Sequence, residues 1–229
     1  MSEKILIVED EIRIRKLLHD YFKREGYEIL EASDGQLALN IFKSNPDVSL
    51  IILDIMIPKL DGFSVCKSLR EISEVPIIML TAKGEESDKL LGFDLGADEY
   101  VTKPFSPKVL VARSKALLKR ATTSKNTSLS GLYELDGLRV NFLSKEVFID
   151  DEKASLSPTE FELLDFMIKN KNIALTRDTL LDNVWGYDYF GDFRTVDTHI
   201  KRLRIKLKEK AKYIKTVRGS GYMFQESGD

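Results

Sequence analysis

The sequence predicts an α/β domain built on a doubly wound, five-stranded parallel sheet (flavodoxin-like), followed by an α+β winged helix-turn-helix domain. In the first half, short apolar runs alternate with amphipathic helical stretches. A polar Ser/Thr/Lys/Asn stretch follows, and short strands, helices and a Gly-rich hairpin come after it. The 229 residues exceed the usual size of one domain, and 43% are hydrophobic, enough for two cores. We expect domains at residues 1–121 and 132–227, with a linker at 122–131.

Five apolar runs in the first domain are predicted strands. Three of them are almost continuously apolar, which is typical of a parallel sheet covered on both faces. Between the runs lie helical patterns, such as Ile14, Leu18 and Phe22 at helix spacing. This alternation favours right-handed crossovers. The predicted strands are Lys4–Val8, Ile29–Ala32, Leu50–Leu53, Ile77–Leu80 and Tyr100–Thr102.

The second domain begins with short alternating stretches that predict antiparallel strands. Ser157-Pro158-Thr159-Glu160 then predicts a helix that starts with a capping box and has proline at its first position. Two more helices and a hairpin with a small, Gly-rich tip follow. The expected bounds are Leu138–Phe142 and Glu146–Ile149 for strands, Thr176–Trp185 and Arg194–Lys210 for helices, and Ile214–Phe224 for the hairpin.

Several classes of protein are disfavoured. Cys66 is the one cysteine, so neither an intrachain disulfide nor a cysteine metal cluster is possible. The amino terminus becomes acidic within ten residues, unlike a signal peptide. Apolar runs are a handful of residues long, whereas a membrane span needs roughly 20. We expect a soluble, cytoplasmic protein without membrane insertion.

Charged or polar residues follow four of the predicted strands. Glu9 and Asp10 follow the first, Asp54 the third, Thr81 the fourth and Lys103 the fifth. Ligands bind beyond the carboxyl ends of such strands, and neighbouring first and third strands would bring the three carboxylates together. Their repulsion requires a hard cation such as Mg²⁺, which also engages phosphate oxygens. The pattern therefore predicts phosphoryl chemistry.

An aspartate in this position can act as a nucleophile and form an aspartyl phosphate. Asp54 ends an apolar, buried strand, so it is the candidate. Lys103 supplies an ammonium to neutralise phosphoryl oxygens, and the Thr81 hydroxyl can hydrogen-bond the new phosphate. A cis peptide between Lys103 and Pro104 would aim the lysine.

These residues resemble the receiver domain of bacterial response regulators over roughly residues 3–121. The resemblance implies that Asp54 accepts the phosphoryl group from a sensor histidine kinase. It implies that Glu9, Asp10, Asp54 and the backbone carbonyl of Met56 hold Mg²⁺, and that Thr81 and Tyr100 are the switch pair. The matching motifs are Glu9-Asp10, Asp54 to Pro58 with Asp61-Gly62, Thr81-Ala82 and Lys103-Pro104-Phe105.

A concentrated basic segment lies in the second domain, although the whole chain carries a net charge of −2. From Arg194 to Arg218 there are ten Lys or Arg and two Asp or Glu, a local charge of +8. This is the electrostatic footprint of a polyanion-binding face. Val196, Ile200, Leu203 and Leu207 share one helix face and are expected in the core.

The opposite face predicts a recognition helix for the DNA major groove. Arginine can bond guanine with two hydrogen bonds, other cations neutralise phosphates, and the exposed Ile205 can touch a thymine methyl. Arg218 in the hairpin can reach the backbone or the minor groove, and we expect His199 to contact a phosphate. The expected DNA-binding residues are Arg194, Thr195, Asp197, Thr198, His199, Lys201, Arg202, Arg204 and Arg218.

Ser157–Phe161, Arg194–Ile200 and Val217–Tyr222 resemble the effector domain of the OmpR/PhoB subfamily, over about residues 130–225. The resemblance implies a phosphorylation-dependent homodimer on direct-repeat half-sites, and a contact of the loop Gly186–Phe193 with RNA polymerase. It also implies a dimer face with paired charges. The charged residues of that face are Lys89, Asp98, Glu99 and Arg113, while Val109 stands where an acidic partner of Lys89 is usual.

The sequence thus predicts a transcriptional regulator of a two-component system, which is not an enzyme although it takes part in its own Mg²⁺-dependent phosphorylation and dephosphorylation. A phosphotransfer enzyme with an accessory basic domain is a second hypothesis. A haloacid dehalogenase-type phosphatase would want an aspartate where Met56 stands. A third is a constitutive DNA-binding regulator with an atypical receiver, whose DNA binding Asp54→Ala would leave unchanged. Stimulus, cognate kinase, operator, and activation or repression stay open.

Overall fold

A computed structural model describes residues 3–81, 96–122, 131–186 and 193–226. The chain divides into two compact units, Met1–Ala121 and Thr122–Asp229. Each unit has its own buried core, as the sequence predicts. Among the helices in these ranges, none has the length and apolar character that a membrane crossing demands.

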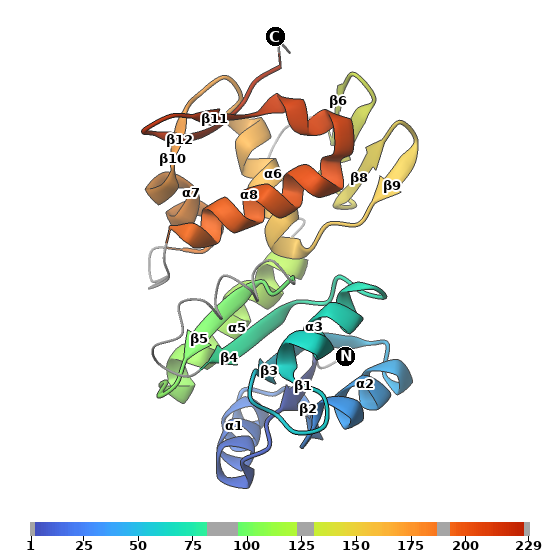
Figure 1. Cartoon of the computed structure of the whole chain (residues 1–229), viewed down its shortest axis with the longest axis vertical. Helices are drawn as coiled ribbons and strands as arrows, with labels where there is room; N and C mark the ends of the chain where they lie inside the picture. The colour runs from blue at the N-terminus through green and yellow to red at the C-terminus, as the bar shows by residue number, and fades with distance from the viewer. Residues whose placement is uncertain (1–2, 82–95, 123–130, 187–192, 227–229) are drawn as a thin grey trace. The chain divides into compact units, whose positions relative to one another are not determined.

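The first unit contains a five-stranded parallel sheet in the order β2-β1-β3-β4-β5 (Figure 1). Strand β1 pairs with β2 on one side and with β3 on the other, with Val8 opposite Leu53. The strands are β1 Lys4–Val8, β2 Glu28–Ala32, β3 Val48–Asp54, β4 Ile77–Thr81 and β5 Glu99–Thr102, and the described helices are α1 Ile12–Arg24, α2 Gly35–Ser44, α3 Gly62–Arg70 and α5 Pro107–Thr122.

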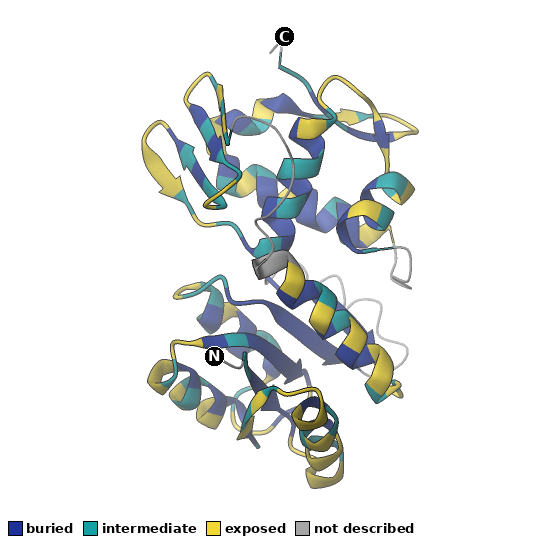
Figure 2. Ribbon diagram, turned by 180° about the vertical axis from the view of Figure 1, so that it is seen from behind, coloured by how far each residue is buried: buried dark blue, intermediate teal, exposed yellow. Residues whose placement is uncertain are grey.

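Helices cover both faces of this sheet. Phe42 of α2 and Leu69 of α3 belong to the core on one face, while Phe22 of α1 and Leu117 of α5 belong to the core on the other. The central strands are therefore buried on both faces, which accounts for their nearly continuous apolar sequence (Figure 2). The predicted doubly wound fold is confirmed, and all five predicted strands are present.

The second unit combines a four-stranded antiparallel sheet, three helices and a smaller three-stranded sheet. Its sheets have the orders β6-β7-β8-β9 and β10-β12-β11. The elements are β6 Leu132–Leu135, β7 Leu138–Asn141, β8 Glu146–Ile149, β9 Glu152–Ala154, α6 Pro158–Lys169, β10 Leu175–Thr176, α7 Arg177–Val184, α8 Arg194–Leu207, the 3₁₀ helix η1 Lys208–Tyr213, β11 Ile214–Val217 and β12 Gly221–Phe224.

Local hydrogen bonds set the starts of the helices in this unit. Ser157 accepts from the Glu160 amide and the Glu160 carboxylate accepts from the Ser157 amide, so the predicted capping box is present. Thr176 accepts from the Thr179 amide and caps α7. The β11–β12 hairpin agrees with the prediction, while β10 joins it as an additional strand along β12.

Several boundaries differ from the sequence prediction, and the ends of α8 and α5 are the two that bear on the predicted recognition helix and linker. Helix α8 ends at Leu207 instead of Lys210, because Lys208 adopts a left-handed φ of 52° and the chain continues as η1. Glycine usually occupies such a position, so a lysine gave no signal there. Helix α5 includes Thr122, the first residue of the expected linker, and residues 123–130 lie outside the described ranges.

Candidate functional site

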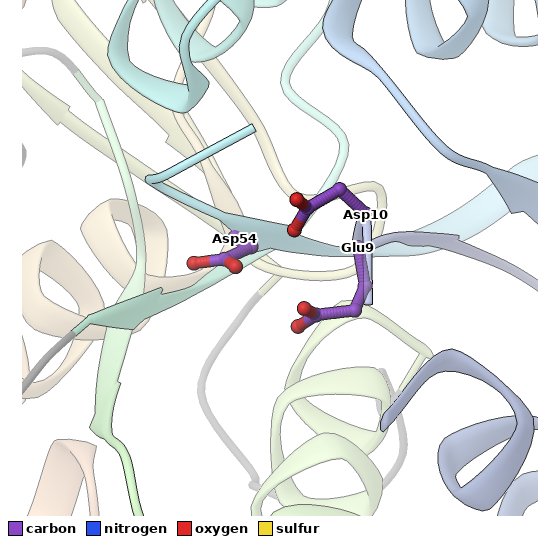
Figure 3. Close-up of side chains that lie close together, drawn as sticks. All are labelled: Glu9, Asp10 and Asp54. Carbon is purple, nitrogen blue, oxygen red and sulfur yellow. The ribbon is translucent and has the colours of Figure 1, made fainter. Parts of the chain in front are cut away.

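Three carboxylates converge where β1 and β3 end side by side (Figure 3). One ligand oxygen from each of Glu9, Asp10 and Asp54 lies within 4.8 Å of the others. Glu9 and Asp54 are buried, with 1% and 4% of their surface exposed, and Asp10 is exposed. The convergence expected from adjacent first and third strands is therefore present.

Lys103 bridges the two buried carboxylates. Its Nζ lies 2.7 Å from Asp54 Oδ2 and 2.7 Å from Glu9 Oε2. The Lys103–Pro104 peptide is cis, as expected. The lysine thus brings a positive charge directly to both buried carboxylates.

Burial and neighbouring charges alter the acid–base properties of this pocket. Burial raises the pKa of Glu9 to about 7, and the Asp54 charge acts in the same direction, while the bond from Lys103 opposes both. Burial alone would lower the pKa of Lys103, but its bonds to Asp54 and Glu9 raise it above the ordinary value. Lys103 therefore stays protonated.

The donor set fits a hard divalent cation. All three converging side chains offer carboxylate oxygens, which Mg²⁺ prefers. The Met56 amide donates to Asp54 Oδ1 at 3.3 Å, so the backbone that follows β3 folds back on the carboxylate. The Met56 side chain is 72% exposed and extends away from the core.

The expected switch residues lie on β4 and β5 beside the pocket. Thr81 is the last residue of β4 and is fully buried. Tyr100 is 6% exposed, and its hydroxyl donates to the sulfur of Met79 at 3.0 Å. The tyrosine ring is therefore directed inward in this structure.

One residue of the expected dimer face lies inside the domain. Asp98 is fully buried, and its Oδ2 accepts from Arg70 Nη2 at 2.8 Å and from the Ile77 amide at 3.0 Å. Asp98, expected as a charged residue of the dimer face, is therefore not at the surface in this structure. The carboxylate instead neutralises a half-buried arginine that ties α3 to β4 and β5.

The other residues expected on the dimer face differ in how far they are buried, where the structure describes them. Glu99 is buried, and Arg113 is half-buried with its guanidinium donating to the Tyr100 carbonyl at 3.2 Å. Lys89 lies outside the described residues, as does most of the loop between Gly186 and Phe193. Val109 is 44% exposed on α5.

The core stripe of the expected recognition helix is confirmed. Val196, Ile200, Leu203 and Leu207 of α8 are each at most 1% exposed. The opposite face presents Arg194, Lys201 and Lys208 to solvent around Ile205, which is 68% exposed. Arg218 is exposed between β11 and β12.

Three expected DNA contacts are buried instead. Thr195 is 1% exposed, and Thr198 is 7% exposed with its hydroxyl donating to the Arg194 carbonyl. His199 is fully buried, bonded through Nδ1 to the Thr195 carbonyl, and packs edge-on against Trp185. Thr195, Thr198 and His199 are thus covered in this structure; Thr195 and His199 flank the core stripe, while Thr198 lies on the outer face with its hydroxyl bonded back to the helix.

Arg202 also faces inward. It is 7% exposed, and its Nη2 lies 2.9 Å from Oε1 of the fully buried Glu160. Lys206 Nζ lies 2.7 Å from the other oxygen of the same carboxylate. The expected DNA contact of Arg202 is therefore corrected to an ion pair that joins α8 to the start of α6.

Asp197 and Arg204 both contact Tyr222 of β12. Asp197 Oδ1 accepts from Arg177 Nε and from the Tyr222 hydroxyl, both at 2.7 Å. Arg204 donates to the Ile214 carbonyl and the Thr216 hydroxyl, and its guanidinium lies 5.6 Å from the centre of the Tyr222 ring. These residues orient the hairpin against α8.

Sequence reasoning missed four residues that organise the two sites. Glu160 was recognised as a helix cap, but its role as a buried partner of two cations was not. Arg177 gave no signal, and Tyr222 was noted only as part of the hairpin motif, since their shared partner Asp197 is twenty or more residues away from each. Arg15, on α1, contacts the loop that carries Glu9 and Asp10 and was likewise missed.

Comparison with known proteins agrees with both halves of the structure. Residues 5–115 match the response regulator receiver domain, and residues 151–224 match the C-terminal domain of transcriptional regulatory proteins. An α/β receiver with an acidic pocket, followed by a winged helix with a basic face, defines a two-component response regulator that regulates transcription. The chain belongs to the OmpR/PhoB family of response regulators.

The similarity to individual relatives extends over nearly the whole chain. The transcriptional regulatory protein SrrA of Staphylococcus aureus is 46% identical over 233 residues, covering 98% of this chain and 96% of SrrA. The Thermotoga maritima OmpR/PhoB homologue DrrB is 32% identical, with a TM-score of 0.52 over 98% of this chain and all of that one. A RitR mutant is 28% identical, with a TM-score of 0.76 over 99% of this chain and 100% of that chain.

Proposed function

We propose that Asp54 is the phosphoacceptor of this response regulator and that a sensor histidine kinase supplies the phosphoryl group. The observation that carries the proposal is the placement of Asp54 at the end of a buried strand, with Lys103 Nζ 2.7 Å from its Oδ2 and Glu9 and Asp10 beside it. A nucleophilic carboxylate needs such a neighbouring cation to offset the charge of an incoming phosphoryl group.

Glu9, Asp10, Asp54 and the Met56 carbonyl would hold Mg²⁺. A bound Mg²⁺ ion supplies positive charge to the phosphoryl oxygens. An oxygen of Asp54 forms the new bond to phosphorus while the bond to the donor breaks, and the donor keeps that electron pair. Lys103 stays protonated and pairs with the new phosphate, and the same carboxylates serve the Mg²⁺-dependent hydrolysis that resets the chain.

Phosphate on Asp54 would change the surface through the switch pair. The Thr81 hydroxyl, at the end of β4, would bond the phosphate, and Tyr100 would reorient on β5 to follow it. A ligand shifts such an equilibrium only by its differential interaction with the two states, which the phosphate–Thr81 bond provides. We propose that the outcome is a homodimer through a face that includes Lys89 and Arg113, since Glu99, like Asp98, is buried.

The DNA face would consist of the exposed side chains of α8, of Lys208 directly after it, and of the hairpin. Arg194, Lys201 and Lys208 would contact phosphates or base edges, Ile205 would contact a thymine methyl, and Arg218 would reach the backbone or the minor groove. Two such faces in a dimer would bind promoter half-sites with the added affinity of bivalence. The loop Gly186–Phe193 would contact RNA polymerase, and the location would be the cytoplasm.

The test of the phosphoacceptor is the intact mass of the full chain after incubation with Mg²⁺ and a small phosphodonor. Wild type and Asp20→Ala, which removes an exposed carboxylate on α1, should each gain one phosphoryl group, and Asp54→Ala should gain none. Labelling of Asp54→Ala to the wild-type level would overturn the assignment. DNA binding that is the same in labelled and unlabelled protein would favour a constitutive regulator.

A further inference from the structure

Arg15, on the first turn of α1, bonds the backbone of the two acidic residues that precede the helix. Its Nη1 donates to the Glu9 carbonyl at 2.6 Å and to the Asp10 carbonyl at 3.2 Å. Glu11, at the N-cap position, makes no side-chain hydrogen bond to the helix. The guanidinium of Arg15, which only donates, does not cap the helix but restrains the loop between β1 and α1 through these two carbonyl groups.

The two bonded carbonyl groups belong to the peptide planes on either side of Asp10. Because peptide planes are rigid, the orientation of one plane sets φ of Asp10 and the orientation of the other sets ψ. One guanidinium thus restrains both dihedral angles of an exposed aspartate whose side chain has no buried surroundings to hold it. These two angles set the direction in which the Cα–Cβ bond of Asp10 leaves the backbone, and so the starting point of its carboxylate.

The guanidinium of Arg15 also pairs with Glu31, a residue of β2. Arg15 Nε lies 3.4 Å from Oε2 of Glu31, and the other oxygen of that carboxylate contacts Nδ1 of His19. The Arg15 side chain is 16% exposed and the Glu31 side chain 38%, so the pair lies at the surface with the guanidinium as its more covered partner. Glu31 thereby fixes the plane of the guanidinium that holds the acidic loop.

We propose that Arg15 is a positioning residue for Mg²⁺: it presets the Glu9–Asp10 backbone so that the carboxylates already converge before the ion binds. The proposal rests on the proposed function, in which this pocket holds Mg²⁺. Contacts that orient metal ligands from outside typically change metal affinity by about 10- to 100-fold. The charge of Arg15 acts in the opposite sense, because a nearby cation repels Mg²⁺.

These two effects differ in sign, which makes the proposal testable. Isothermal titration of the full chain with MgCl₂, without any phosphodonor, gives the Mg²⁺ Kd directly. If Arg15 positions the loop, Arg15→Lys keeps the charge and loses the forked donor, and its Kd rises roughly tenfold. The Kd of Arg15→Ala also rises, but by less than that of Arg15→Lys, because alanine also removes the charge that repels Mg²⁺. The Kd of Glu31→Gln rises by about threefold, since this change weakens only the support of the guanidinium.

Arg13→Ala is the matched control. Arg13 lies exposed on the same helix, so this variant removes the same charge without touching the loop, and its Kd should stay within about twofold of wild type. Each variant is compared with wild type by thermal unfolding, so that a lost affinity in a protein of unchanged melting temperature supports positioning.

A Kd for Arg15→Lys equal to that of wild type, or tighter binding by Arg15→Ala, would overturn the proposal while leaving the metal site intact. Failure of wild type itself to bind Mg²⁺ would overturn the proposed metal site, and this inference with it.

Discussion

Glu160 of α6 and Arg202 of α8 form an ion pair in which the carboxylate is fully buried, with Arg202 Nη2 2.9 Å from Glu160 Oε1. The same carboxylate accepts from the Ser157 amide and from Lys206. One residue therefore caps the first helix of the winged helix-turn-helix and holds the recognition helix against it. The sequence motif for the cap also sets the position of the DNA-binding helix.

Glu160→Ala should strongly destabilise the second unit. It leaves Arg202 as a buried cation without its carboxylate and removes half of the capping box, and breaking such a pair costs about 3–5 kcal/mol of unfolding free energy. Urea unfolding followed by the fluorescence of Trp185, which is buried in the same unit, measures the change. Glu152→Ala removes an exposed carboxylate paired with Lys208 and should change the unfolding free energy by less than about 1 kcal/mol.

The stability that Glu160 provides should depend on pH. Burial by itself raises the pKa of Glu160, but the charges of Arg202 and Lys206 outweigh it and hold the pKa below its ordinary value of 4.5. The carboxylate therefore contributes stability that is fully present above pH 4.5 and is lost as the pH falls through the lowered pKa. The difference in unfolding free energy between wild type and Glu160→Gln should be constant from about pH 7 to about pH 5 and shrink below that. A difference that grows on acidification would contradict this sign.

Gly62→Ala should displace the backbone of Asp54, against which Gly62 packs. A Cβ at Gly62 would lie 2.3 Å from the Asp54 carbonyl oxygen and 2.8 Å from Ile55 Cα. Backbone atoms cannot yield as a flexible side chain would, so β3 or α3 must shift, at about 1–3 kcal/mol. Thermal unfolding and the extent of Asp54 phosphorylation should both fall. Ser68→Ala on the same helix tests whether any alanine in α3 has this effect.

The receiver pocket could be predicted from sequence because each of its residues follows a strand. Once β1 and β3 are neighbours, the strand ends alone bring Glu9 and Asp54 together. Arg15 could not be found in this way, since its partners are backbone carbonyls that carry no residue identity.

The recognition helix was predictable in its core stripe and less so in its polar face. Helix spacing identifies one buried arc, but α8 packs on α6 and on the hairpin as well, so Arg202 and Arg204 are drawn to Glu160 and Tyr222. A charged residue on a flank can face DNA or a buried partner, and only the tertiary contacts decide between them. The same applies to Asp98, whose partner Arg70 lies in another helix.

Ile205→Lys should strengthen DNA binding and make it more dependent on salt. Ile205 is 68% exposed within the basic face, so a lysine there adds a cation without disturbing the core. One added phosphate contact steepens the plot of log affinity against log salt by about 1. Titration of a labelled promoter fragment at several salt concentrations measures the slope. Ile205→Ala keeps the charge unchanged, so its slope should equal that of wild type, and an equal slope for the lysine variant would place residue 205 away from the phosphates.

Lys201→Ala and His199→Ala should separate DNA contact from helix support, although the two residues lie two positions apart in the same helix. Lys201 is exposed on the outer face of α8, so its loss should weaken binding across all sequences and reduce the salt slope by about 1, without changing the melting temperature. His199 is fully buried against Trp185, so its loss leaves a cavity and should destabilise the unit by about 1–3 kcal/mol. At a temperature where His199→Ala remains folded, its salt slope should match that of wild type, because no phosphate contact is removed. A reduced slope in folded His199→Ala would mean that the histidine leaves the core when α8 meets DNA.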